Sequence, residues 1–348
     1  MSDKVSLLIG GRRIEKFLRY RIEADLYTAD DAFSMELANP GMDIDPGQLC
    51  QVHVNGQLAL TGIIDRVEDG TDKRGGTLSV EGRDFMGLLV DSYVEEFPDL
   101  QGVTLKALAE QLLRKVPFIN RKTISYQQGI AGAASQQTGE NALLDTAHEY
   151  AKVEPGQTIF DVLKDYAKSR GAMFYALPDG TLVFGRPKAK GQPVYRIIMR
   201  RDGVGNNALS GTRTRDISRR YSKIVVLGSQ QGIDQLDAEQ VNTEGTVTDT
   251  AVPFYKPLVK CNNNDGQSPL QEARMLLEQQ RADGFKLVYR MARHSQNGRN
   301  YTINELCQVI DEPRKIAGTY LVYGRTFELS KEEGQTTTLR LGLPGVIQ

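Results

Sequence analysis

The sequence predicts a mainly β protein, with a related β domain at each end and a small α/β domain between them. Three observations lead to this prediction. Residues 61–92 alternate apolar and polar positions on both sides of a Gly-rich polar turn, the pattern of a hairpin. The tetrapeptide Leu-Cys-Gln-Val occurs at 49–52, before this hairpin, and again at 306–309, before a second hairpin pattern. Helical periodicity falls between these hairpins, in segments such as 104–117.

The repeated tetrapeptide carries the prediction of relatedness. After each copy come a strand, a polar turn and a second strand in the same order, at 62–82 and at 324–342. This agreement favours an internal duplication. The alternative, that any meander of short strands looks alike, is left open by the sequence alone. A single hairpin cannot bury enough apolar surface to be stable, so each copy must belong to a larger sheet or barrel.

The composition is that of an ordinary soluble globular protein. The chain has 348 residues, 40% of them hydrophobic and 25% charged, which is enough for two or three domains. The formal net charge of -1 argues against a nucleic-acid-binding surface over the whole protein. No apolar run approaches the length of a membrane span, and the N-terminus lacks a secretion signal. Cys50, Cys261 and Cys307 are too far apart in sequence for a metal-binding motif, and we expect no disulfide framework.

Residues 1–95 form the first predicted β domain. Alternating apolar positions predict strands at 20–27 and 32–37, and a further strand at 49–54. Asn55-Gly56 is a strong two-residue hairpin turn after that strand. Five to seven short strands at regular spacing are typical of a barrel or a sandwich.

Residues 96–192 form the predicted α/β domain. One helix is expected after the N-cap Thr104 and before Pro117. A second is expected after Thr158, because Asp161 completes a capping box three residues later. A hairpin should follow at 172–184, and the polar stretch at about 119–150 predicts an exposed insertion.

Residues 193–348 form the second predicted β domain. Strands are expected over 194–228, most clearly at 217–227, whereas 229–266 have weak apolar signals and predict a long excursion. Ser268-Pro269 and a capping-box glutamine predict a helix over about 269–283. A strand at 285–291 then leads to the second copy of the tetrapeptide.

Catalytic chemistry is poorly represented. His53, His148 and His294 have no partner at metal-ligand spacing, and there is no Gly-x-Ser-x-Gly motif and no phosphate-binding loop. We therefore predict no catalytic, metal-binding or cofactor-binding residues, no cofactor, and a protein that is not an enzyme. For Arg83-Asp84 the favoured interpretation is structural, with Asp84 capping the next turn and Arg83 pairing locally.

A basic run over 196–223 is the one candidate functional surface. It contains two acidic residues, Asp202 and Asp216. Such a stretch could face a polyanion, meet acidic residues of a neighbouring subunit, or form a solvated strand face. The candidate channel or subunit-interface residues are Arg196, Arg200, Arg201, Arg213, Arg215, Arg219 and Arg220.

Several motifs together resemble one family. The strand end Val80–Asp84 is followed by the apolar run 85–90; later come Pro155–Leu163, a late helix at 272–281 and the strand 304–309. This order resembles the baseplate hub proteins of contractile-tailed phages, a group related to the hub part of type VI secretion spikes. Two departures from the family pattern are the absence of tryptophan, with Tyr301 where one is expected, and the length of the insertion at 119–150.

The resemblance implies a structural role in the tail baseplate of a virion, with synthesis in the bacterial host cytoplasm. It implies two related β-barrel domains and a homotrimer, so that three chains form a pseudo-six-fold ring. The ring would adapt a six-fold tail tube to a three-fold central spike. Implied partners are the spike, the tail tube, baseplate wedge and tape-measure proteins, and passing DNA through non-specific contacts.

Two alternatives to this role are a cell-wall hydrolase and a cell-wall-binding module. A cell-wall hydrolase carried on the same particle would need an acid, base or nucleophile cluster that the sequence does not offer. A peptidoglycan- or carbohydrate-binding module would need exposed aromatic rings, and the chain has no tryptophan and 7% aromatic residues.

Overall fold

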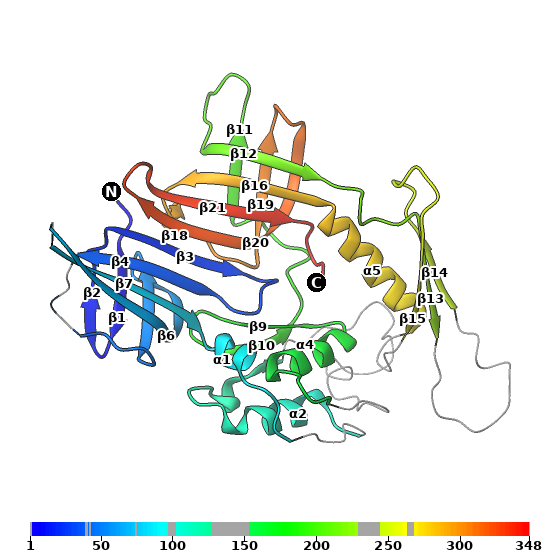
Figure 1. Ribbon diagram of the computed structural model, residues 1–348. Coiled ribbons are helices and arrows are strands. Elements are labelled where there is room, and N and C mark those ends of the chain that lie inside the picture. Colours follow the sequence, from blue (N-terminus) through cyan, green and yellow to red (C-terminus); the bar gives the residue numbers. More distant parts are fainter. Residues whose placement is uncertain are drawn as a thin grey trace.

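The structure is a computed structural model. It describes residues 2–38, 41, 43–73, 75–96, 102–126, 153–228, 244–262 and 268–347. Most of the described strands belong to one large sheet, which Figure 1 shows running from the blue N-terminal strands to the red C-terminal strands.

The first part of this sheet, unit 1, is the N-terminal meander. Along the sheet its strands follow the order β3-β4-β7-β6-β5-β1-β2. The strands are β1 (Val5–Ile9), β2 (Arg12–Ile14), β3 (Arg19–Asp25), β4 (Ala32–Ala38), β5 (Leu49–Val54), β6 (Gln57–Asp72) and β7 (Gly75–Asp84). The turn between β5 and β6 is the predicted one, because Asn55 and Gly56 both have positive φ, at 51° and 77°. The hairpin predicted from residues 61–92 is therefore confirmed as β6 and β7, and helix α1 (Met86–Asp91) follows it.

The second part, unit 2, is built from C-terminal strands. Its order along the sheet is β12-β16-β21-β20-β19-β11. The strands are β11 (Tyr195–Met199), β12 (Ala208–Arg215), β16 (Phe285–Ala292), β19 (Glu305–Asp311), β20 (Ile316–Ser330) and β21 (Gly334–Gly342). A short ribbon of β17 (Ser295–Gln296) and β18 (Arg299–Asn300) lies between β16 and β19 in the chain.

The two units repeat the same strand order. Reading β3-β4-β7-β6-β5-β1 beside β12-β16-β21-β20-β19-β11 pairs each strand with one counterpart. The longest strands, β6 and β20, are counterparts, and each shifts register against its hairpin partner, between Ile64 and Arg66 in one and Val322 and Gly324 in the other. One difference remains: β1 is antiparallel to β5, whereas β11 is parallel to β19. The repeat predicted from the tetrapeptide therefore extends over six strands.

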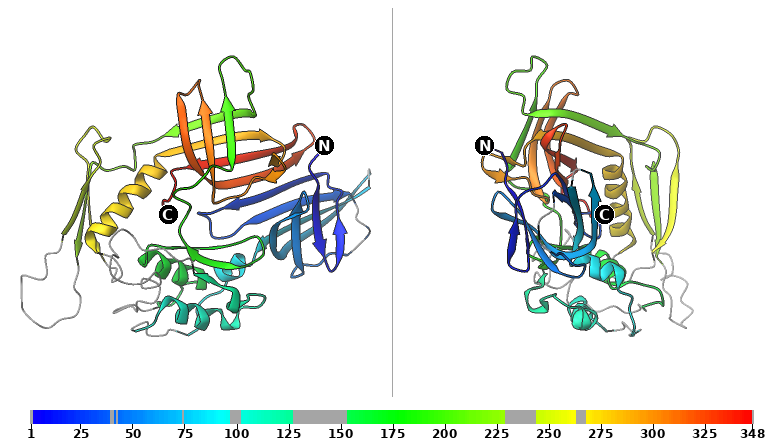
Figure 2. Two further views of the ribbon diagram at one scale, coloured as in Figure 1. Left: turned by 180° about the vertical axis from the view of Figure 1, so that it is seen from behind. Right: turned by 60° about the vertical axis from the view of Figure 1, so that its left-hand side comes forward.

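The units share one sheet instead of forming two closed barrels. Strand β3 of unit 1 pairs antiparallel with β20 of unit 2, which joins thirteen strands. Among the described residues the ladder does not return to its first strand, so two closed barrels are not confirmed. Figure 2 shows the same continuity from two further directions. The domain boundaries near residues 95 and 192 stay predictions.

The α/β part follows unit 1 and has its own apolar core. Its elements are α2 (Leu105–Leu112), the 3-10 turns η1 (Leu113–Lys115) and η2 (Arg121–Thr123), β8 (Ser125–Tyr126), α4 (Ile159–Ser169), β9 (Met173–Ala176) and β10 (Leu182–Gly185). Thr104 caps α2, and Thr158 and Asp161 form the predicted capping box of α4. Both helices and the hairpin are confirmed. Of the predicted insertion, 121–126 hold η2 and β8, and 127–150 lie outside the described residues.

A small sheet and a helix are inserted into unit 2, and here two predictions were wrong. The elements are β13 (Lys223–Gly228), β14 (Glu244–Thr248), β15 (Pro257–Asn262) and α5 (Pro269–Asp283). The strand predicted at 217–227 begins only at Lys223, because Asp216 accepts a hydrogen bond from the Ser218 backbone and bends the chain first. The excursion predicted at 229–266 contains β14 and β15, which pair with β13. Helix α5 has the predicted capping box and covers this sheet.

Candidate functional site

The junction between β3 and β20 is the place where the two units are fixed to each other. Six residue pairs lie opposite one another, from Gly324 and Asp25 to Leu329 and Tyr20. On the solvent face, Arg21 of β3 and Glu328 of β20 are directly opposite and form an ion pair of 2.7 Å. Cross-strand pairs of this kind stabilise a register.

The buried side of the junction is polar at its centre. His294 is fully buried and lies between the units: its Nε2 is 2.6 Å from the Tyr20 hydroxyl, and its Nδ1 is 3.0 Å from the Thr337 hydroxyl. Its ring also contacts Phe327, with 4.6 Å between centroids. Burial lowers the pKa of His294 to about 4. The ring is therefore neutral at pH 7, and its hydrogen bonds link β3 of unit 1 to β21 of unit 2.

A second polar group lies beside it. Arg325 is almost fully buried, its guanidinium lies over the Phe327 ring, and burial lowers its pKa to about 10. Burial raises the pKa of Asp31 to about 7, while the nearby charge of Arg325 opposes that rise. Both residues border a cavity of about 230 Å³ between unit 1, unit 2 and the β9–β10 hairpin. Sequence analysis did not single out Arg325, because only the tertiary fold brings it to Asp31.

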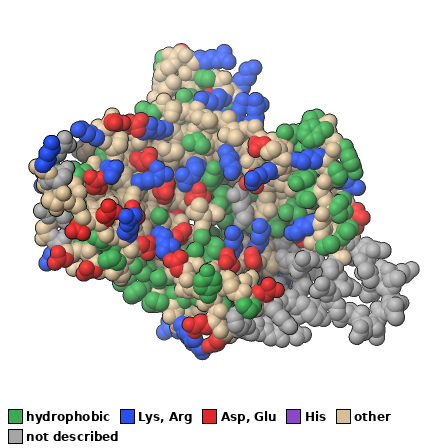
Figure 3. All heavy atoms as spheres, in the orientation of Figure 1, with side chains coloured by type: hydrophobic (Ala, Val, Ile, Leu, Met, Phe, Trp, Pro, Cys, Tyr) green, Lys and Arg blue, Asp and Glu red, His purple; other side chains and the backbone are tan. Residues whose placement is uncertain are grey.

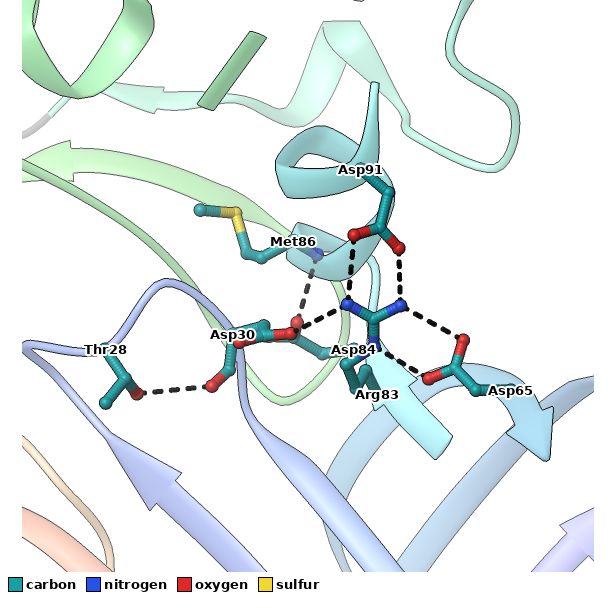
Figure 4. A network of polar contacts seen from close by, with 7 residues as sticks. All are labelled: Thr28, Asp30, Asp65, Arg83, Asp84, Met86 and Asp91. Atoms are coloured by element: carbon teal, nitrogen blue, oxygen red, sulfur yellow. Dashed lines mark hydrogen bonds and ion pairs between the residues drawn. The ribbon is translucent and has the colours of Figure 1, made fainter. Parts of the chain in front are cut away.

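Arg83 organises the exit from unit 1 toward α1. Its guanidinium donates to Asp65, Asp91 and Asp30, at 2.8, 2.6 and 3.3 Å (Figure 4). The neighbouring Asp84 accepts a hydrogen bond of 3.0 Å from the Met86 backbone at the start of the helix. The structural interpretation of Arg83-Asp84 is therefore confirmed.

The candidate arginines fall into two groups. Arg196 lies on β11, Arg200 and Arg201 in the turn after it, and Arg213 and Arg215 on β12. In Figure 3 lysine and arginine side chains gather at the top of the view, over the end of the sheet that carries β11 and β12. These five arginines therefore lie on β11, on β12 and in the segment that connects them.

Arg219 and Arg220 lie elsewhere, in the bend before β13. Arg219 is exposed, whereas Arg220 donates two hydrogen bonds to Asp249, at 2.6 and 3.1 Å. The Asp249 carboxylate is buried and also accepts from Arg281 at 3.0 Å. Burial tends to raise the pKa of Asp249, but the hydrogen bonds from Arg281 and Arg220 outweigh it and lower the pKa. Arg220 thus holds the bend against α5.

This contrast gives a direct prediction. Arg220→Ala should lower the free energy of unfolding by about 1–3 kcal/mol, because it removes one partner of a buried carboxylate. Arg219→Ala, the matched control one residue earlier, should change it by less than about 0.5 kcal/mol. Urea unfolding followed by circular dichroism measures both. Equal effects of the two variants would contradict the assignment of Arg220 to this contact.

Within the described residues, no group of three or more histidine, cysteine, aspartate or glutamate side chains is arranged to hold a metal ion. None of the described helices has the length and apolar character needed to cross a bilayer.

The amino-acid sequence is similar to those of phage Mu baseplate proteins. Residues 4–84, nearly all of unit 1, match the family described as Mu phage baseplate assembly protein GpP-like, N-terminal. The baseplate hub protein gp44 of Escherichia phage Mu is 23% identical over 291 residues, which are 81% of this chain and 71% of gp44.

Two solved structures have a similar fold over almost the whole chain. The tail protein from Neisseria meningitidis MC58 has a TM-score of 0.82 and 26% identity, covering 98% of this chain and 97% of that one. The 43 kDa tail protein of prophage MuSo2 from Shewanella oneidensis has a TM-score of 0.74 and 21% identity, covering 97% of each chain. The resemblance to phage baseplate hub proteins is confirmed, and the chain is related to the tail proteins of Mu-like phages.

Proposed function

We propose that this relative of the Mu-like tail proteins is a structural baseplate hub protein of a contractile phage tail or a phage-like injection particle. In this proposal three copies form a ring that adapts the six-fold tail tube to the three-fold central spike. The observation that carries the proposal is the repeated strand order of units 1 and 2. A repeat within one chain lets a three-fold assembly present six similar surfaces.

The parts that are not repeated support the same proposal. Among the described residues, the α/β part with α2 and α4 occurs once, as does the inserted sheet β13–β15 with α5. Figure 1 places the α/β part on one side of the large sheet, away from the β11–β12 end. A trimer would therefore present six similar units in its ring and only three copies of each inserted part. That combination suits an adaptor between six-fold and three-fold partners.

The arginines on β11, on β12 and in the segment between them fit this assembly in two ways. Arg196, Arg200 and Arg201 lie at one end of the sheet, where they would meet a polyanion such as passing DNA if this end faces the channel. Arg213 and Arg215 lie on an edge strand and would meet a neighbouring subunit. In the proposal the tail tube and the spike bind opposite sides of the ring, and wedge and tape-measure proteins bind around it. The protein is then a component of the virion tail.

The first test is the mass of the purified protein in solution. We expect light scattering across a dilution series to give three times 38.6 kDa, and negative-stain images to show a closed ring. Mixing with the spike protein should preserve that stoichiometry. A mass of 38.6 kDa at every concentration, with and without the spike, would contradict the trimeric hub. Clearing of a peptidoglycan gel would instead favour a cell-wall hydrolase.

A further inference from the structure

We propose that β12 of one copy adds to the open edge of β6 in the next copy, in the register that β3 uses on β20, and that Arg213 then pairs with Asp69. The inference rests on the proposed ring and names the contact that closes it. It follows from the internal repeat, because a contact between unit 1 and unit 2 within a chain provides a template for the contact between chains.

The template is defined by strand equivalence. In the order of strands along the sheet, β3 comes first in unit 1 and β12 comes first in unit 2. Strand β6 and strand β20 are the long middle strands of the two units. Within the chain, β3 of unit 1 pairs with β20 of unit 2. The equivalent contact therefore joins β12 of unit 2 to β6 of unit 1, and these must come from different copies if it repeats around a ring.

Both edges needed for this contact are open. One edge of β20 is shared by two strands: β19 pairs with it as far as Val322, and β3 pairs with it from Gly324 to Leu329. The equivalent edge of β6 pairs with β5 as far as Ile63. Beyond Ile64, no strand among the described residues pairs with this edge. Strand β12 ends the sheet and pairs only with β16 in the described chain. Open edges of this kind are templates for strand addition.

The register shifts align the two units residue by residue. Val67 lies opposite Val80 just past the first shift, as Arg325 lies opposite Leu339 just past the second. Phe327 and Asp69 each lie two residues further along and are therefore equivalent. This fixes the β6 half of the contact.

The same procedure across the neighbouring strands fixes the β12 half. In unit 1, Val80 of β7 lies opposite Met35 of β4, which lies opposite Tyr20 of β3. In unit 2, Leu339 of β21 lies opposite Tyr289 of β16, which lies opposite Gly211 of β12, so Tyr20 and Gly211 are equivalent. Two residues further on, Ile22 is equivalent to Arg213. Since Ile22 lies opposite Phe327, Arg213 of one copy lies opposite Asp69 of the next.

The charges on the two edges are complementary. Glu68 and Asp69 are exposed on β6, and on β12 Arg215 is exposed and Arg213 partly exposed. Opposite charges directly across an antiparallel pair stabilise the register. The internal junction uses the same device one position away, with Arg21 opposite Glu328. In the proposed contact the equivalents of that pair are Thr212 and Gly70, so the ion pair moves to the adjacent position and thus to the opposite face of the sheet, where the internal junction has Ile22 and Phe327.

One feature shortens the proposed contact relative to its template. Arg314 donates a hydrogen bond to the Gly211 carbonyl, and Arg213 donates to the Arg314 carbonyl at 2.9 Å. The Gly211 end of β12 is therefore already hydrogen-bonded. The run available for addition is Thr212 to Arg215, opposite Gly70 to Val67 in the next copy. Each copy offers one β6 edge and one β12 edge, so the contacts repeat head to tail, which is the arrangement that a closed ring requires.

A charge exchange tests the register. Asp69→Arg or Arg213→Glu should each raise the dissociation constant of the oligomer by about tenfold or more, because like charges then face each other. The double variant D69R/R213E should restore assembly. Glu110→Arg, an exposed position on α2, is the control and should assemble like the wild type. Sedimentation over a dilution series measures assembly, and circular dichroism checks folding.

Cross-linking provides an independent measurement. Asp69→Cys and Arg213→Cys are combined with Cys261→Ser, which removes the one exposed cysteine and leaves Cys50 and Cys307 buried. Mild oxidation should give disulfide-linked oligomers on a non-reducing gel, and neither single cysteine variant should.

The outcomes separate this inference from the proposed function. Cross-linking together with rescue by the charge exchange supports the inference. A trimer by mass that neither cross-links nor responds to the charge variants overturns the strand contact and leaves the trimeric hub standing. A monomer that does not cross-link overturns both.

Discussion

Phe327→Ala should lower the free energy of unfolding by about 3–5 kcal/mol, the range of large-to-small changes of a buried phenylalanine. The Phe327 side chain is 1% exposed and lies opposite Ile22 across the junction between the two units. Its ring contacts His294 and lies under the Arg325 guanidinium, 4.1 Å from the ring centroid. It also borders the 230 Å³ cavity. Truncation would therefore enlarge an existing space and uncover a buried cation.

Urea unfolding of Phe327→Ala, compared with Glu328→Ala, measures this effect. Glu328 is the next residue on β20, on the solvent face, and its ion pair with Arg21 should contribute about 0.2–1 kcal/mol. The expected difference between the variants is thus a few kcal/mol. If both lose the same amount, the junction is not a packed core, and the two units are held by their strand pairing alone.

His294 should make the protein sensitive to acid. Its pKa is lowered from 6.5 to about 4 in the folded protein, chiefly by burial. Between these two values the unfolded chain binds a proton that the folded chain does not, so stability falls as the pH falls through this window. A change from 6.5 to about 4 corresponds to a loss of about 3 kcal/mol that is complete near pH 4.

Chemical unfolding of the wild type and His294→Gln at pH 7, 5.5 and 4 measures this contribution. Glutamine does not titrate, so the variant should lose about 3 kcal/mol less than the wild type between pH 7 and pH 4. All other side chains are the same in the two proteins, so the difference between their pH dependences reports the contribution of His294. Parallel stability curves for the two proteins would show that the imidazole is hydrated when folded.

Much of the local structure was predictable from short-range chemistry. The capping boxes at Thr158 and Ser268 were identified correctly, since a cap depends on residues three positions apart. The Asn55-Gly56 turn was equally clear, because few residues adopt positive φ at both positions. Strands β14 and β15 were missed: their apolar residues are sparse, and they are stabilised by pairing with β13.

The candidate site was also only partly predictable from the sequence. The basic run was visible in the sequence, but the sequence does not separate Arg220, which binds buried Asp249, from Arg213, which lies on an open edge. The sequence did not point to Asp69, although the two repeated hairpins, once aligned, place it in the position equivalent to Phe327. Aligning them residue by residue requires the register shifts, which are properties of paired strands and not of one strand.

The sequence by itself determined that this is a mainly β protein with capped helices, and it favoured an internal repeat. These features depend on periodicity and on contacts within a few residues, which the order of amino acids specifies directly. Only the tertiary structure decided that the two units share one sheet through β3 and β20, and that His294 and Arg325 are buried where they meet. Pairing between strands some 300 residues apart depends on which edges are left open after local folding, and a linear pattern does not contain that information.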